Sequence, residues 1–143
     1  MMKIILPYPP SVNRFWMSVA TMTERYRVTG KLKDLRIITF PTSEAKEYMQ
    51  QVRKIFLASQ LPKLGGDIEL HMIFFRPQRS GDLDNFFKAP IDALKNFAFF
   101  DDKHIVRIIA ERHEDPRNPR VEIEILPVGL FAEQMSIQEL LPL

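Results

Sequence analysis

Apolar and polar side chains alternate along several stretches of the chain, which is the pattern of a β-strand with one buried face. The clearest stretch is DIELHMIFF (67–75), and RVEIEIL (120–126) follows the same rule. HIVRIIAER (104–112) is predicted as a further strand, and the apolar run at 2–6 as a short one, stopped by Pro7, which has no N–H for a β-ladder. The pattern therefore predicts four main strands.

Two other stretches have apolar residues at helical spacing. In residues 43–60 they recur every three or four positions, and Thr42 or Ser43 can cap the first turn. A second helix is predicted over residues 85–97. Pro90 lies inside it, and its missing N–H would kink the helix or delay its start.

The order β-α-β-α-β-β predicts an α/β domain with a mixed β-sheet and two main helices packed on it. A chain of 143 residues suits a single domain. We place it at residues 1–128, followed by a C-terminal extension at 129–143 that is either a tail or a short helix. Residues 26–40 have β-rich ends around Gly30 and are expected to form a hairpin.

The composition narrows the class of protein. With 45% hydrophobic and 27% charged residues the chain is typical of a soluble globular protein, and the absence of cysteine excludes disulfides and thiolate-bound zinc. The N-terminal apolar run is too short for a signal peptide or membrane span, so we expect a cytoplasmic protein without a membrane partner.

The net charge of +2 favours anionic partners only mildly. Residues 14–36 carry six basic and two acidic side chains, which could grip phosphates or simply form a solvated surface.

The segment SGDLDNFFKAPIDALKNFAFFDD (80–102) has a pair of aspartates at each end. Asp82 and Asp84 are two positions apart, so in an extended segment both carboxylates would point the same way, and Asp84 could also cap the following helix. Lys88 is one helical turn beyond Asp84. Asp101 and Asp102 can meet the first pair only if the chain folds back.

Carboxylates gathered in one place repel each other unless a cation lies between them. Oxygen ligands favour magnesium or manganese, and a magnesium ion held by carboxylates suits phosphodiester hydrolysis. An EF-hand is excluded because Phe87 and Ala93 stand where its loop needs Gly and Glu. On spacing alone an alternative stays open, in which the first pair is a helix cap with a surface acid and the second a solvated turn.

The stretch DLDNFFKAPIDALKNFAFFDDKHIV resembles the central signature of the RusA-type Holliday junction resolvases. LPYPPSVNRFW (6–16) is similar to the opening of that family, and the resemblance covers residues 3–16 and about 67–126. It implies a small homodimeric α/β nuclease that uses magnesium to nick four-way DNA junctions symmetrically. Residues 17–43 form a longer connection than we expect for compact members, and could alter the shape of the dimer.

The resemblance also implies roles for individual residues. Asp82, Asp84 and Asp102 match the metal-binding aspartates, Asp101 is a further candidate ligand, and Lys88 matches the catalytic lysine.

Other residues have less defined roles. Asn85 could act in helix capping or in function, and Asp92 is interpreted as structural. Candidate DNA contacts are Asn13, Arg14, Arg76 and Arg79, of which the first two could instead close a turn. Phe15 and Trp16 could stack on bases, but packing on the sheet is the favoured interpretation.

These observations predict a Mg²⁺-dependent endodeoxyribonuclease, with Mn²⁺ able to substitute, that resolves Holliday junctions in DNA recombination and repair. A symmetric homodimer would place two equivalent sites on the two-fold symmetric junction. The alternatives are a non-catalytic branched-DNA-binding protein, a metal-dependent phosphodiesterase acting on other nucleic-acid structures, and a purely structural protein.

Overall fold

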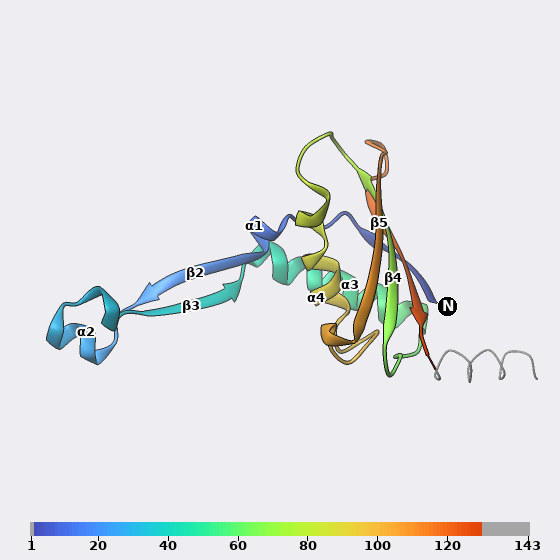
Figure 1. Ribbon diagram of the computed structural model, residues 1–143. Helices are drawn as coiled ribbons and strands as arrows, with labels where there is room; N and C mark the ends of the chain where they lie inside the picture. The colour runs from blue at the N-terminus through green and yellow to red at the C-terminus, as the bar shows by residue number, and fades with distance from the viewer. Residues whose placement is uncertain (1, 130–143) are drawn as a thin grey trace, which may run out of the picture.

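The computed structural model describes residues 2–129 and shows a mixed β-sheet, helices packed against it, and a two-stranded ribbon that projects far from the body (Figure 1). The strand order in the sheet is β1-β6-β4-β5, with β4 and β5 parallel and the other neighbours antiparallel. The sheet strands are β1 (Met2–Pro7), β4 (Ile68–Arg76), β5 (Ile105–Glu114) and β6 (Arg120–Pro127). The predicted α/β class with a mixed sheet is confirmed.

One face of the sheet carries the core, because alternate side chains of β1, β4 and β6 point to it. The buried residues of these strands are Met2, Ile4, Leu6, Ile68, Leu70, Met72, Phe74, Arg76, Val121, Ile123 and Ile125. Helix α3 (Ser43–Ser59) packs on this core through Ala45, Tyr48, Val52 and Phe56. The helix begins as predicted, since the Thr42 hydroxyl accepts a hydrogen bond from the Ala45 N–H at 3.2 Å.

The second predicted helix is shorter than expected. A 3₁₀ helix, η2 (Leu83–Phe86), comes first, and helix α4 (Lys88–Leu94) follows it. Pro90 therefore lies in the first turn of α4, where its missing N–H leaves no helical bond unmade. The prediction of one helix over 85–97 was wrong at both ends, and Asn96 with φ 70° marks the C-terminal stop.

The ribbon pairs a strand that the sequence pattern did not predict, β2, with one that falls on the predicted β-rich end of residues 26–40. Helix α1 (Val12–Phe15) leads into β2 (Trp16–Thr21), which runs antiparallel to β3 (Arg36–Pro41), with Trp16 opposite Pro41. We call residues 16–41 the arm. Its strands are mostly exposed on both faces (Figure 1).

The tip of the arm is helical rather than a β-turn, so the predicted hairpin over 26–40 was wrong in its first strand and its turn, although its C-terminal end does form β3. Helix α2 (Glu24–Thr29) is followed by the 3₁₀ helix η1 (Leu32–Asp34). The Thr23 hydroxyl accepts a hydrogen bond from the Tyr26 N–H and caps α2, and Gly30, with φ 64°, ends it. These local caps outweigh the β-rich composition of the segment.

The C-terminal extension and the absence of a membrane span were also predicted. The C-terminal extension at 129–143 lies, apart from Gly129, outside the described residues, so the choice between a tail and a short helix stays a prediction. Between residues 2 and 129, no helix has both the length and the apolar character needed to cross a membrane.

Candidate active site

The first aspartate pair lies in the segment that joins β4 to α4. Asp82 has an extended backbone and occupies the position before η2, whereas Asp84 lies within that 3₁₀ helix. The expectation that the two side chains project together from one extended segment was therefore wrong. Neither aspartate caps α4, because Phe87 precedes it and makes no side-chain cap.

The second pair lies after α4, where the chain folds back toward η2. Asp101 immediately precedes the 3₁₀ helix η3 (Asp102–His104), which leads into β5. Asp84 and Asp102 line the same cavity, which has a volume of about 400 Å³. Two carboxylates that are 18 positions apart in the sequence thus face one space. We call this space the catalytic cavity, after the candidate catalytic residues that line it.

Lys88 also lines the catalytic cavity, and apolar side chains form the rest of its wall. These apolar residues are Phe87, Ile91, Ile105 and Ile108. The three charged groups stay open to solvent, with the Lys88 side chain 42% and the Asp102 side chain 43% exposed, so an ion or a phosphate can reach them from outside.

Lys88 is held by an ion pair within its own helix. Its Nζ lies 3.1 Å from Oδ1 of Asp92, one turn further along α4, and the Asp92 side chain is only 13% exposed. The other Asp92 oxygen is buried and has no hydrogen-bond partner among the described residues. The structural role predicted for Asp92 thus has a specific form, since Asp92 anchors the lysine of the cavity.

Lys95 pairs with the second aspartate pair and was missed in the sequence. Its Nζ lies 3.6 Å from Oδ1 of Asp101 and 3.6 Å from Oδ1 of Asp102. The carboxylate of Asp101, and then that of Asp102, raises the pKa of Lys95. A hydrogen bond between the Asp101 and Asp102 side chains, and next the hydrogen bond that Asp101 accepts from the Lys103 backbone N–H, lower the pKa of Asp101 to about 2. Lys95 directly follows the last residue of α4, and a basic residue at a helix C-terminus beside an acidic turn was the available signal.

The structure brings together only part of the predicted metal centre. Asp84 and Asp102 share the catalytic cavity, Asp82 does not line it, and Asp101 faces Lys95 next to it. Within residues 2–129, no three side chains of Asp, Glu or His are grouped closely enough to hold a metal ion. The donor set still fits magnesium, which commonly keeps several waters and is held by one or two carboxylates together with substrate phosphate.

The four predicted DNA contacts differ in their environment. Asn13 and Arg14 are exposed on α1, and Arg79 is exposed in the loop after β4. Arg76 is only 6% exposed and pairs with Glu114 at 3.4 Å, so it is the least accessible of the four, and its contact with DNA stays a prediction. Alternation along β4 places Arg76 on the same buried face as Phe74, a signal that the sequence contained.

Comparison with known protein families places the chain in a nuclease family. The chain matches the family described as Endodeoxyribonuclease RusA over residues 16–126. The protein therefore belongs to the RusA endodeoxyribonuclease family. The match includes the arm and every candidate residue from Asp82 to Asp102, but begins at the end of the predicted opening motif. No curated protein matches the chain.

Proposed function

We propose that the protein is a magnesium-dependent endodeoxyribonuclease that resolves Holliday junctions by paired, symmetric nicks in DNA recombination and repair, acting in the cytoplasm. The observation that carries this proposal is the shared catalytic cavity, where Asp84 and Asp102 face Lys88. Membership of the RusA endodeoxyribonuclease family supports the reaction class.

The proposed chemistry divides between the carboxylates and the lysine. Asp84 and Asp102 would hold Mg²⁺, or Mn²⁺ in its place, which when bound would polarise the scissile phosphate and activate a water. Lys88, positioned by its ion pair with Asp92, would stabilise the negative charge that builds up on the phosphate oxygens. Asp82 and Asp101 remain proposed ligands, because each is close in sequence to a cavity carboxylate.

We further propose that two copies form a homodimer through the arm. Large apolar side chains on the arm are strongly exposed, including Val28 at 87%, Leu32 at 78% and Ile37 at 73%. An isolated two-stranded ribbon is marginally stable in water, and an apolar surface of this kind is typical of a protein interface. A second copy is the proposed partner because a two-fold dimer matches the symmetry of a four-way junction.

A substrate panel tests this function. Labelled four-way, three-way and linear DNA are incubated with the protein in Mg²⁺, alongside the Asp84→Asn and Asp102→Asn variants. We expect symmetric nicks in the four-way junction, their loss in both variants, and their retention in the control variant Asp115→Asn, which changes an aspartate between β5 and β6. Junction binding without nicking by the wild-type protein would support a binding module. Equal cleavage of linear DNA would support a general phosphodiesterase.

A further inference from the structure

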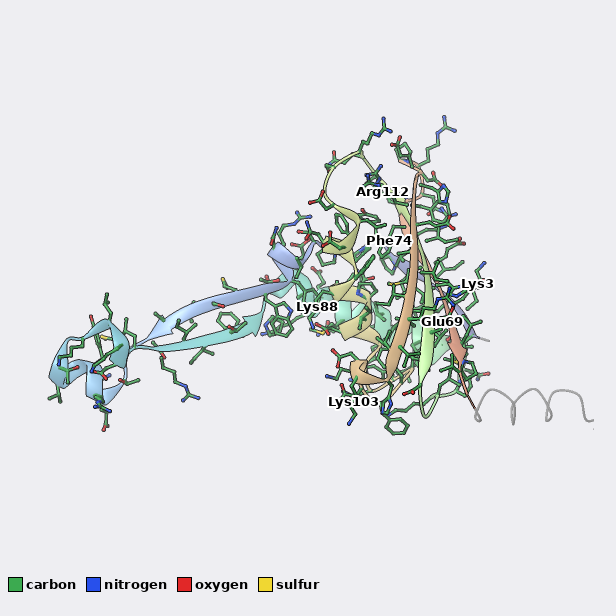
Figure 2. All side chains as sticks on the ribbon, in the orientation of Figure 1. Lys3, Glu69, Phe74, Lys88, Lys103 and Arg112 are labelled. Atoms are coloured by element: carbon green, nitrogen blue, oxygen red, sulfur yellow. The ribbon has the colours of Figure 1, made fainter. Side chains whose placement is uncertain are left out.

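A second cavity lies beside the catalytic cavity, where the arm joins the body. Its volume is about 320 Å³, and Lys88 and Asp102 line both cavities. Figure 2 shows Lys88 at this junction between the arm and the body. Trp16, Lys95 and Asn96 also line the second cavity, and none of these three lines the first. A strand of nucleic acid bound in the catalytic cavity would therefore have the second cavity directly next to it.

Trp16 gives this second cavity a flat aromatic surface. The ring makes an edge-to-face contact with Phe15, with 5.5 Å between the centroids and an angle of 72°. Phe15 is fully buried, whereas Trp16 stays 38% exposed. The favoured prediction of packing therefore holds for Phe15 and only in part for Trp16. An indole that is anchored by a buried neighbour and still open to a cavity can stack on a planar ligand at little cost in side-chain entropy.

Polar groups on the helix side complement this ring. Lys95 is anchored between Asp101 and Asp102, and an ammonium group has three donors, so one donor remains for an anion. Asn96 is exposed, and its backbone N–H donates to the Phe99 carbonyl at 2.7 Å. Its side-chain amide makes no hydrogen bond to any residue within 2–129, and so can pair with the edge of a base.

We infer that the second cavity is a subsite for one nucleotide of the cleaved strand, adjacent to the scissile phosphate. The base stacks on Trp16, Asn96 meets its edge, and Lys95 binds the neighbouring phosphate. This inference rests on the proposed function. It identifies the nucleotide in the subsite as the part of the substrate that makes the enzyme selective. A base must leave its stack to enter the subsite, which costs less at a branch point than within a continuous duplex.

The single tryptophan of the chain makes the subsite directly observable. The Asp84→Asn protein, which is not expected to cut, is titrated with a four-way junction while the emission of Trp16 is recorded. A series of junctions then carries one abasic nucleotide at successive positions around the branch point. We expect junction binding to quench the emission, and one or two abasic positions to abolish the quenching.

Variants of Trp16 test the same contact by affinity. Trp16→Leu should weaken junction binding about tenfold, the order expected for the loss of one stacked base, whereas Trp16→Phe should retain most of the affinity. Rescue by Phe separates stacking from a folding defect. Phe75→Leu, on the opposite face of the sheet where the ring packs against Arg120 at 3.7 Å, is the matched control and should bind normally.

The inference is overturned if Trp16→Leu binds the junction as tightly as the wild-type protein, or if no abasic position changes the quenching. Neither measurement requires cleavage. Failure of the wild-type protein to nick four-way DNA would therefore remove the proposed function, while the quenching series would still decide whether the subsite holds a base.

Discussion

The ammonium of Lys88 lies 3.1 Å from an oxygen of Asp92, and the two groups differ sharply in exposure. The Lys88 side chain is 42% exposed, whereas that of Asp92 is 13% exposed. Loss of either partner therefore has different consequences, because a buried carboxylate without a partner is costly and an exposed ammonium without one is not.

We predict that Lys88→Met lowers the free energy of unfolding by about 1–3 kcal/mol, since it strands the Asp92 carboxylate. Asp92→Asn should cost less than about 1 kcal/mol, because Lys88 can turn to solvent. Urea denaturation of both variants and of the double variant measures the difference. Equal costs for the two single variants would contradict the assigned anchoring.

Substitutions of Lys88 and Asp92 should also differ in their effect on the nicking rate. Lys88→Met is expected to slow nicking by about 100-fold or more, because it removes a charge directed at the reacting phosphate. Asp92→Asn leaves that charge in place and only loosens its position, so its effect on the nicking rate should be smaller. Single-turnover rates on a four-way junction provide the measurement. A larger loss in Asp92→Asn than in Lys88→Met would count against Lys88 as the group that touches the phosphate.

The pH dependence of stability should report on Asp101. The folded state holds the pKa of Asp101 at about 2, below its ordinary value of 3.8. The resulting stabilisation is complete above pH 3.8 and is lost as the pH falls toward 2. The difference in stability between the wild-type protein and Asp101→Asn should therefore shrink across this window, as followed by urea denaturation at successive pH values. A difference that stays constant from pH 5 to pH 2 would show that Asp101 is not held in this way.

The start of α3 is linked through Thr42 to α1, the helix that leads into the arm. Its hydroxyl accepts from the Ala45 N–H and also donates to the Arg14 carbonyl at 2.6 Å. Thr42→Ala should lower the stability by about 1–2 kcal/mol, whereas Thr42→Ser, which keeps the hydroxyl, should be close to the wild-type protein. Thermal unfolding of both variants tests this, and equal losses would assign the effect to the methyl group instead.

The arm provides a test of the proposed homodimer. Ile37→Asp introduces a charge at a side chain that is already 73% exposed, so the single copy should fold normally while the dimer dissociates. Leu57→Asp is the control, because Leu57 is 61% exposed on α3, away from the arm. Analytical ultracentrifugation should show a monomer for the first variant and a dimer for the second. A wild-type protein that sediments as a monomer would rule out the dimer.

The sequence predicted the elements whose signals are local and periodic. Alternation located β4 and β6, and the cap at Thr42 together with helical spacing located α3. The same rules misjudged the arm, because the cap at Thr23 and the left-handed Gly30 build a helix within a segment of β-rich composition. Pro90 was correctly seen as an obstacle, but its place in the first turn of α4 depends on the chain beginning its helix at Lys88.

The sequence predicted which residue types form the candidate site better than it predicted how they are arranged. The meeting of Asp84 with Asp102 was an expectation that required the chain to fold back after α4, and the path from Asn96 to Asp101 provides this. The position of Lys95 between two carboxylates depends on that same path, as does the juxtaposition of Asn96 with Trp16. No periodic pattern encodes a contact between an arm strand and a helix terminus.

The most direct test of the central claim is metal binding by the two carboxylates of the catalytic cavity. Mn²⁺ binding to the wild-type protein, Asp84→Asn, Asp102→Asn and Asp115→Asn can be measured by electron paramagnetic resonance, with no substrate present. We predict that Asp84→Asn and Asp102→Asn each lose most of the Mn²⁺ affinity, while Asp115→Asn retains it. Wild-type affinity in both cavity variants would contradict a metal site shared by Asp84 and Asp102.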